Sequence, residues 1–315
     1  MKKAPKVSIC ILNMNGVRCL EDCLSSAMNQ EYADYEILLV DNGSSDGSVE
    51  FVRMRFPDVR VVELGPENVG VSVSRNVAVD NSVGEYIMTL DNDAVMDSRC
   101  LGELVGAIES NVNIGSCQAK IMRMDNQTTI EYIGFLRFRR GHVHLAGRGE
   151  KDEGQYDEPR QIVLASTCAA LYRRIALEEA GKWDEDFFYM HEDVDLGLRL
   201  ESLGWRCMYV PTATVFHYGS GTTGRKSNRT YYLFIRNRWY FVIKNFRILD
   251  IMFFLVETPW RVIWEIMPHL IKRRFDRFYM CLKGNIDGLR VLPELFAKRA
   301  QVRQSARTCH LMKRF

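Results

Sequence analysis

Two aspartates in the stretch GEYIMTLDNDAV, residues 84–95, have a type and spacing suited to metal chemistry. The apolar run from Tyr86 to Leu90 has the pattern of a buried strand, and Asp91 and Asp93 follow it directly. Two neighbouring carboxylates raise each other's pKa unless a cation is present. Mg²⁺ and Mn²⁺ bind one or two carboxylates together with phosphate oxygens. The spacing predicts a divalent-cation site, and an Asp-rich turn that caps the next helix stays open as the alternative.

Position distinguishes this pair from similar ones elsewhere. Asp-x-Asp also occurs at 184/186 and 193/195, and about one such pair is expected by chance in a chain of this length. Only the pair at 91/93 follows a predicted buried strand, so we expect the cation there.

A second group of acids lies in HEDVDLGLRL, where Glu192, Asp193 and Asp195 begin a predicted helix. The helix dipole favours acids in a first turn, which accounts for one or two of them. The preceding WDEDFFYM is rich in aromatic residues, and a carboxylate among such side chains has a raised pKa and can act as a general base. His217, in VFHYGSG after another predicted strand, is either a packed residue or a metal ligand.

The first half of the chain supplies elements that can position these groups. Strand patterns alternate with helical patterns: KVSICIL, a helix at Arg18 to Met28, YEILLVD, GSVEFVRMRF, VRVVEL, VSVSRNVAVDNS and EYIMTLD. Such alternation predicts a parallel sheet with helices on both faces. In these sheets ligands bind outside the carboxyl ends of the strands.

Polar loops follow all four of these strands. They are Asn13-Met14-Asn15-Gly16, DNGSSDGS at 41–48, ENVGVSVSRN at 67–76 and DNDA. DNGSSDGS is either a tight turn or a nucleotide site, where a carboxylate accepts a hydrogen bond from a pyrimidine N–H or a ribose hydroxyl. The sequence has neither Gly-x-Gly-x-x-Gly nor a Walker lysine motif, so dinucleotide-binding and P-loop interpretations lose support.

A break in charge near residue 225 divides the chain. Residues 225–315 hold 20 Lys and Arg against 6 Asp and Glu, whereas residues 1–224 hold 22 against 34. We therefore predict an α/β domain at 1–224 and a basic, amphipathic, helical segment at 225–315. The middle of the chain, roughly 115–165, includes the polar, glycine-rich stretch RFRRGHVHLAGRGEKDEGQYDEP, which predicts a long functional loop or partial disorder.

The cysteines and the tail suggest a location. Nine cysteines without CxxC spacing, in a chain without a signal peptide, predict reduced thiols in the cytoplasm, with Cys10 and Cys168 in the core. No apolar run approaches the roughly 18 residues of a membrane span. The aromatic residues of the tail either pack on the α/β domain or lie on the anionic inner face of the plasma membrane. The tail is too apolar to favour nucleic acid.

Taken together, these motifs resemble glycosyltransferase family 2, the inverting transferases of GT-A fold, and in particular its bacterial rhamnosyltransferase branch. The resemblance covers residues 6 to about 240. It is carried, in order, by VSICILNMNG, LLVDNGSSDGSVEFV, ENVGVSVSRN, GEYIMTLDNDAV, GKWDEDFFYMHEDVDLGLRLESLG, VFHYGSG and IRNR. It implies transfer of a sugar from a nucleoside-diphosphate sugar, UDP- or dTDP-linked, to a saccharide or lipid-linked saccharide.

The resemblance also implies roles for individual residues. Asp193 would be the catalytic base, with Glu192 as the fallback. Asp91, Asp93 and His217 would hold Mn²⁺ or Mg²⁺. The nucleotide sugar would be bound by Asn13, Asp41 at the pyrimidine ring, Asn42, Arg75 near the diphosphate, and Asp91 near the ribose.

Two positions depart from the family pattern, and two other functions stay open. Ser74-Arg75 replaces small residues common in relatives, and His191 stands where relatives have Gly or Thr. A sugar nucleotidyltransferase would show a GGxGxRL-type loop after the first strand, which LNMNGVRCL is not. A non-catalytic binding protein of the same fold would not need the acids at 91, 93 and 193.

Overall fold

The computed structural model describes residues 5–139, 142–219 and 227–308. As predicted, the chain begins with alternating strands and helices. These are β1 (Val7–Asn13), α1 (Val17–Met28), β2 (Tyr35–Asp41), α2 (Ser48–Arg55), β3 (Arg60–Glu63), α3 (Val71–Asn81) and β4 (Tyr86–Asp91). Leu20, Cys23, Leu24 and Ala27 form the buried face of α1, at the spacing that an amphipathic helix requires.

The middle of the chain forms strands, which corrects the expectation of a long loop at 115–165. The elements from β5 to β12 are β5 (Ala94–Met96), α4 (Cys100–Glu109), β6 (Ile114–Arg123), β7 (Ile130–Tyr132), β8 (Phe135–Arg139), β9 (His142–Leu145), β10 (Arg160–Ile162), β11 (Ala169–Arg173), α5 (Arg174–Glu179), η1 (Glu185–Phe187), α6 (Glu192–Ser202) and β12 (Arg206–His217). Most of these strands are too short for alternation to be visible in the sequence.

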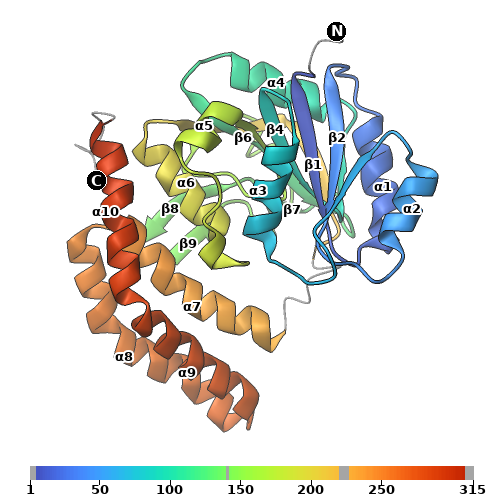
Figure 1. The fold of residues 1–315 in the computed structure, drawn as a ribbon. Helices are drawn as coiled ribbons and strands as arrows, with labels where there is room; N and C mark the ends of the chain where they lie inside the picture. The colour runs from blue at the N-terminus through green and yellow to red at the C-terminus, as the bar shows by residue number, and fades with distance from the viewer. Residues whose placement is uncertain (1–4, 140–141, 220–226, 309–315) are drawn as a thin grey trace.

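The main sheet is mixed rather than wholly parallel. Its strand order is β10-β12-β6-β11-β4-β1-β2-β3, with β5 paired to β12 and β7 to β6 (Figure 1). The four predicted strands are parallel to one another, and β11 enters antiparallel between β4 and β6. The expectation of a parallel sheet therefore holds for its β4-β1-β2-β3 half and for the pair β6-β12, but not for β11.

Strand register brings the predicted polar residues together. Asn13 pairs with Asp41, and Leu12 pairs with Asp91, so β1, β2 and β4 end in one row. On the other side of β4, His217 of β12 pairs with Ala94 of β5. This antiparallel pairing places His217 beside the acids although more than a hundred residues separate them in the chain.

The tail forms four helices, as its amphipathic pattern predicts. They are α7 (Asn228–Asn245), α8 (Ile248–Ile271), α9 (Phe275–Arg290) and α10 (Leu292–Thr308), and they lie together on the side of α6 (Figure 1). Trp239 and Phe241 of α7 are buried in one apolar cluster with Phe187 and Val194 of the α/β part. The predicted boundary at residue 225 lies outside the described residues. No helix in the described part of the chain is long and apolar enough to cross a membrane.

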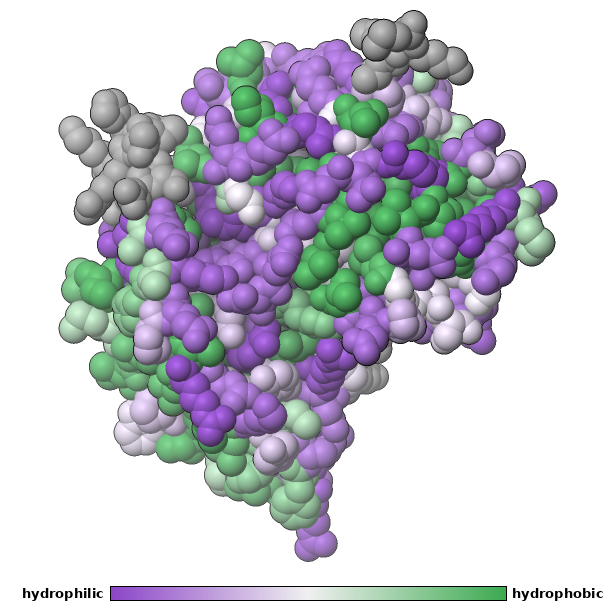
Figure 2. Space-filling view, viewed as in Figure 1, coloured by the Kyte–Doolittle hydropathy of each residue, from purple (hydrophilic) through white to green (hydrophobic). Residues whose placement is uncertain are grey.

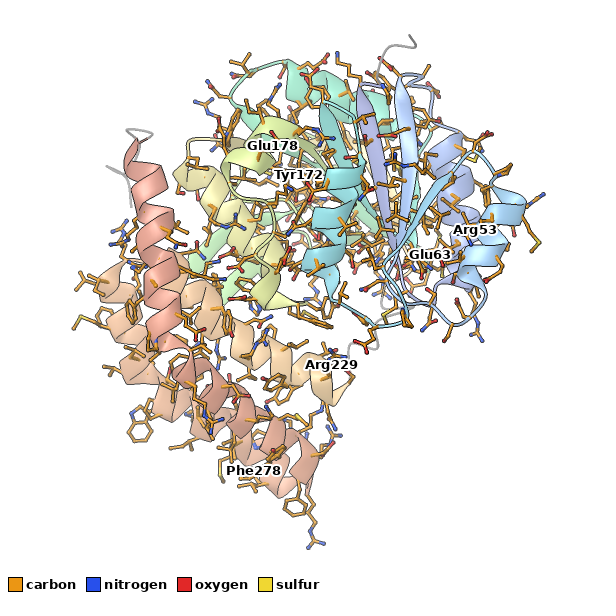
Figure 3. The ribbon with its side chains drawn as sticks, in the orientation of Figure 1. Arg53, Glu63, Tyr172, Glu178, Arg229 and Phe278 are labelled. Carbon is orange, nitrogen blue, oxygen red and sulfur yellow. The ribbon has the colours of Figure 1, made fainter. Side chains whose placement is uncertain are left out.

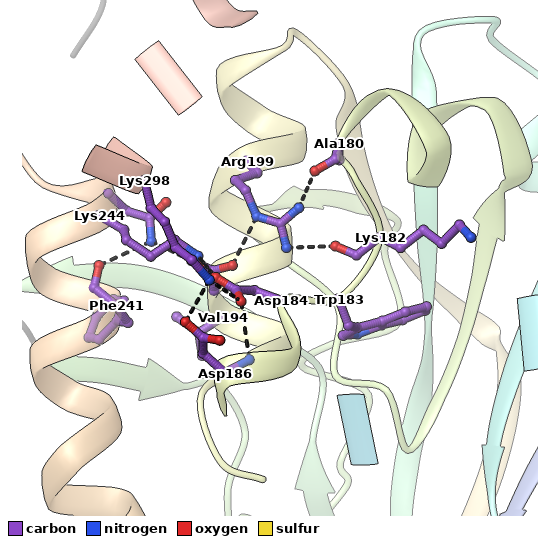
Figure 4. A network of polar contacts seen from close by, with 12 residues as sticks. Ala180, Lys182, Trp183, Asp184, Asp186, Val194, Arg199, Phe241, Lys244 and Lys298 are labelled. Carbon is purple, nitrogen blue, oxygen red and sulfur yellow. Dashed lines mark hydrogen bonds and ion pairs between the residues drawn. The ribbon is translucent and has the colours of Figure 1, made fainter. Parts of the chain in front are cut away.

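The Asp-x-Asp pair at 184/186 serves to attach this tail (Figure 4). Lys298 of α10 contacts Asp184 at 2.9 Å and Asp186 at 2.6 Å, and Lys244 of α7 contacts Asp184 at 2.5 Å. Lys244 also contacts the fully buried Asp195 at 2.8 Å. Burial alone would raise the pKa of Asp184, but Lys244 and Lys298 hold it well below its usual range. These acids are therefore structural.

Candidate active site

A cavity of about 290 Å³ opens at the carboxyl ends of β1, β2 and β4. Its lining includes six of the predicted site residues: Asn13, Asn42, Arg75, Asp91, Asp93 and His217. Ser227 and Arg229, at the N-terminal end of α7, also line it. Figure 3 shows that this end of α7, with Arg229, lies near the α/β part. The other predicted residues, Asp41, Glu192 and Asp193, do not line this cavity.

Asp41 supports the cavity floor from behind. Its carboxylate accepts hydrogen bonds from Asn13 Nδ2 at 2.8 Å, from the Ser44 hydroxyl at 2.5 Å and from the Ser44 N–H at 2.9 Å. Asn13 Oδ1 in turn accepts from Asn92 Nδ2 at 2.8 Å. A Cβ at Gly16 would lie 2.0 Å from Asn92 Nδ2, so only glycine fits against this network. The polar floor is thus fixed before any ligand arrives.

Asn42 fixes the loop that precedes α3. Its Nδ2 donates to Asn68 Oδ1 at 3.0 Å, and its Oδ1 accepts from the Val69 N–H at 2.9 Å. Gly70 follows with φ of 95°, and a Cβ there would lie 2.6 Å from the Phe188 ring. The close approach of Gly70 to Phe188 brings the start of α3 against the loop before α6.

Arg75 lies between Asp91, one of the predicted metal ligands, and Glu192 of α6. Its Nη1 donates to Glu192 Oε1 at 2.8 Å, and its Nη2 lies 3.7 Å from Asp91 Oδ1. Burial raises the pKa of Asp91 to about 6; Arg75 opposes this shift and Asp93 adds to it. Glu192 is buried, and one of its two carboxylate oxygens is engaged by Arg75.

His217 lies between two carboxylates. Its Nε2 is 3.1 Å from Asp93 Oδ1, and its Nδ1 is 2.7 Å from Glu131 Oε2. Burial alone would lower the pKa of His217, but a charge on Cys168 and the carboxylates of Asp93 and Glu131 raise it. Burial also raises the pKa of the neighbouring Cys168 thiol.

The donor set fits a divalent cation. Ligand atoms of Asp91, Cys168 and His217 lie within 4.8 Å of one another, and Asp93 contacts His217 directly. Two carboxylates and an imidazole suit Mn²⁺ and accommodate Mg²⁺. The residues predicted as metal ligands are therefore brought together by the fold.

Sequence reasoning missed two members of this cluster, Glu131 and Cys168. Cys168 is buried, as predicted, but its sulfur lies beside Asp91 because the Asp91 N–H donates to the Cys168 carbonyl at 2.9 Å. Glu131 is in β7, within the region expected to be a loop. No local pattern marks either residue, because their positions depend on antiparallel pairing between distant strands.

Asp193 is half-buried in the first turn of α6. Its Oδ1 accepts a hydrogen bond from the Val194 N–H at 2.8 Å. Burial raises its pKa to about 7; the charge of Glu192 adds to this shift and Arg75 opposes it. The direction agrees with the prediction from the aromatic surroundings. A carboxylate with this pKa exchanges protons near neutral pH, as a general base must.

The loop just before Asp193 has a strained backbone. Phe188, Met190 and His191 have φ values of 62°, 74° and 68°, a region that costs non-glycine residues about 1–3 kcal/mol each. Asn237 of α7, which is fully buried, donates from Nδ2 to the carbonyls of Phe187, Tyr189 and Met190 at 2.8, 2.7 and 2.8 Å. The tail thus holds the loop in its strained shape. Asn237 lies in the IRNR stretch, which the sequence analysis matched without assigning it a role.

Replacing Asn237 by Ala should lower both stability and turnover. The change takes a hydrogen-bond donor from the carbonyls of Tyr189 and Met190, which costs about 1–3 kcal/mol, and it frees the loop that orients Asp193. Urea unfolding and the turnover rate at saturating donor measure the two effects. Asn285→Ala is the matched control, because Asn285 is a buried amide of α9 that bonds to Trp239 and Cys281 within the tail. Equal turnover in the two variants would contradict a positioning role for Asn237.

Comparison with known proteins supports one family. The model of glycosyl transferase family 2 matches residues 8–181. An N-acetylglucosaminyl-diphospho-decaprenol L-rhamnosyltransferase of Mycobacterium tuberculosis is 26% identical over 246 residues, which cover 70% of this chain and 80% of the relative. A poly-beta-1,6-N-acetyl-D-glucosamine synthase of Staphylococcus epidermidis is 26% identical over 66% of this chain, which spans about half (48%) of that protein.

Solved structures share the fold at low sequence identity. GalNAc-T7, solved with UDP, GalNAc and Mn²⁺, has a TM-score of 0.59 and 16% identity, over 78% of this chain and 51% of that chain. The mannosyltransferase PcManGT from Pyrobaculum calidifontis, solved with GDP-Man and Mn²⁺, has a TM-score of 0.57 and 15% identity, over 100% and 89%. Both are glycosyltransferases, and the mixed α/β sheet described above is the GT-A fold. Since the family model covers more than half of the chain, this protein belongs to glycosyl transferase family 2.

Proposed function

We propose that this glycosyltransferase moves a sugar from a nucleoside-diphosphate sugar to a hydroxyl of a saccharide or lipid-linked saccharide, with inversion at the anomeric carbon. The observation that carries the proposal is the cavity at the carboxyl ends of β1, β2 and β4. Its polar floor, the acids Asp91 and Asp93 and the guanidinium of Arg75 surround one volume. Asp193 follows Glu192, the residue that Arg75 contacts, and it is close enough to Arg75 for the guanidinium charge to affect its pKa.

The floor of the cavity would bind the nucleotide. Asn13 and Asn42 line it, and Asp41 orients Asn13 from beneath. One carboxylate oxygen of Asp41 accepts only one hydrogen bond from within the described chain, that of the Ser44 N–H, and it keeps capacity for a pyrimidine N–H. Asn92, which bonds to Asn13, would support the same subsite.

Asp91, Asp93 and His217 would hold Mn²⁺ or Mg²⁺. When bound, the cation supplies the positive charge that stabilises the departing diphosphate. Mn²⁺ in both structures named above supports this choice. Arg75, 3.7 Å from Asp91, would keep that carboxylate ionised and oriented.

Asp193 would take the proton from the acceptor hydroxyl as that oxygen attacks the anomeric carbon. Glu192, held by Arg75, keeps a negative charge beside Asp193 and so raises its basicity. The bond from the anomeric carbon to the diphosphate breaks as the bond to the acceptor oxygen forms, and the electron pair leaves with the diphosphate. One displacement inverts the configuration, and no covalent intermediate with the protein is formed.

The mycobacterial relative supports a rhamnosyl donor and a diphospholipid-linked acceptor for this chain too. A nucleotidyltransferase is disfavoured because the family match is to transferases that use nucleotide sugars. A panel of UDP-, dTDP- and GDP-sugars, assayed by release of nucleoside diphosphate in the presence of Mn²⁺, tests the proposal. We expect one donor class to be turned over. No release from any donor by folded protein, with saccharide and lipid-linked acceptors supplied, would favour a non-catalytic protein.

A further inference from the structure

The outer face of α8 is apolar along almost its whole length. After Asp250, every exposed residue of this helix is apolar, in a stripe that includes Phe253, Val256, Trp260, Trp264, Met267 and Ile271. Trp260 and Trp264 are 70% and 77% exposed. We call this stripe the α8 face. Figure 2 shows apolar side chains gathered over α8 and α9 at the lower left.

Three charged residues of α8 beyond Asp250 are held in ion pairs. Arg261 pairs with Glu257 at 3.2 Å, and Glu265 pairs with Arg238 of α7 at 2.5 Å. A solvent-exposed helix face normally carries charged or polar residues. A contiguous apolar patch of this extent on the surface marks an interaction site. Only part of the tail's aromatic set is therefore explained by packing: Trp239 is buried, whereas Trp260 and Trp264 are not.

Positive charge lies at the end of the α8 face. Lys272, Arg273 and Arg274 form the turn from α8 to α9, and all three are exposed. An exposed apolar stripe with tryptophans, joined to a cluster of cations, matches a lipid interface with anionic headgroups. Since α8 does not qualify as a membrane-spanning helix, this chemistry suits a helix that lies in the plane of the interface.

The basic turn is also close to the cavity. Asp276, two residues after the turn, accepts a hydrogen bond from Asn228 Nδ2 at 2.8 Å, and the neighbours of Asn228, Ser227 and Arg229, line the cavity. Figure 3 shows Phe278 of α9 and Arg229 of α7 toward the same end of the helical tail. A surface that contacts the α8 face would therefore lie near the end of α7 that borders the site.

We propose that the α8 face and the basic turn Lys272–Arg274 dock this protein on an anionic lipid surface, with Trp260 and Trp264 inserted among the lipids. This docking deepens the proposed function, because it would bring a lipid-linked acceptor to the cavity. It does not depend on the donor chemistry, so vesicle binding tests it separately from catalysis.

The experiment compares co-sedimentation with vesicles of phosphatidylcholine alone and of phosphatidylcholine with phosphatidylglycerol. We expect the full chain to bind the anionic vesicles, with tryptophan emission shifted to the blue and quenched by brominated lipid. The double variant Trp260→Ser/Trp264→Ser should bind about tenfold or more weakly, because two large apolar groups no longer enter the lipid. Lys272→Glu/Arg274→Glu should lose the preference for anionic lipid.

The matched control is Met54→Ser/Val112→Ser, which removes two apolar side chains that are 80% and 76% exposed on the α/β part. It should bind like the unaltered protein, and all variants should keep the nucleotide release of the panel assay when the acceptor is a water-soluble saccharide. Unchanged binding of the tryptophan variant would overturn the proposal, as would failure of the unaltered protein to bind anionic vesicles. So would a stable dimer, measured by light scattering, that the tryptophan variant converts to a monomer.

Discussion

Replacing Asp193 by Asn should lower turnover by about 10²-fold or more while donor affinity stays nearly unchanged. The amide keeps the size of the side chain and can still accept from the Val194 N–H, but it cannot take a proton from an acceptor hydroxyl. Turnover at saturating donor and acceptor measures the first effect, and donor titration by calorimetry measures the second. Weaker donor binding at an unchanged rate would instead assign Asp193 to the donor site.

The pH profile supplies an independent check on the same assignment. Burial and Glu192 raise the pKa of Asp193 to about 7, so its ionised form is lost as the pH falls through that value. The turnover of the unaltered protein should drop about tenfold per pH unit below it. The residual activity of Asp193→Asn should lack this drop. Glu192→Gln leaves Asp193 in place but removes the charge that helps to raise its pKa and weakens the contact with Arg75. This variant should therefore keep the drop in turnover but show it at lower pH.

Removal of divalent metal should abolish turnover, and Mn²⁺ or Mg²⁺ should restore it. Asp93→Ala should have the same effect without unfolding the protein, because in the proposed site Asp93 would contribute a ligand oxygen, and it contacts His217 at 3.1 Å. A readout apart from activity is the melting temperature. Mn²⁺ should raise it for the unaltered protein, since a ligand that binds only the folded state stabilises that state.

The control for this prediction is Asp97→Ala, which removes the acid four residues after Asp93. The Asp97 side chain is 40% exposed and contacts Arg99. It should keep both the metal-dependent activity and the rise in melting temperature. Full turnover by the unaltered protein in excess chelator would rule out the role that we give to Asp91, Asp93 and His217.

The half of the sheet formed by β1 to β4 could be predicted from the sequence, because patterns in neighbouring residues define its strands and helices. The first four strands could be predicted because each is a short apolar run that ends in polar residues, and the helices between them are patterned. Once those strands are parallel neighbours, Asn13, Asp41 and Asp91 must end in one row, and the structure has this register. The raised pKa of Asp193 was also predictable, because its surroundings are apolar.

The rest depends on contacts between distant segments. His217 reaches Asp93 only because β12 pairs with β5, and Glu131 and Cys168 reach the same cluster through β7 and β11. The contact between Arg75 and Glu192 was not predictable either. Arg75 Nη1 lies 2.8 Å from Glu192 Oε1, although more than a hundred residues separate the two in the chain.

The tail shows a further limit of pattern reasoning. Its aromatic residues look alike in sequence, yet Trp239 and Phe241 are buried against the α/β part, and Trp260 and Trp264 face outward. Periodicity predicts that α8 has two faces but not which one meets the protein. Asn237 illustrates the same point, since its importance comes from carbonyl groups some fifty residues earlier.

The anomeric configuration of the product tests the central claim most directly. A single displacement assisted by Asp193 must invert the configuration at the anomeric carbon, whatever the donor sugar. The one-bond C1–H1 coupling of the new linkage, measured by NMR on product from the donor that the panel identifies, reports this configuration. We predict that an α-linked donor gives a β-linked product, or the reverse; a product with the configuration of the donor would contradict the account.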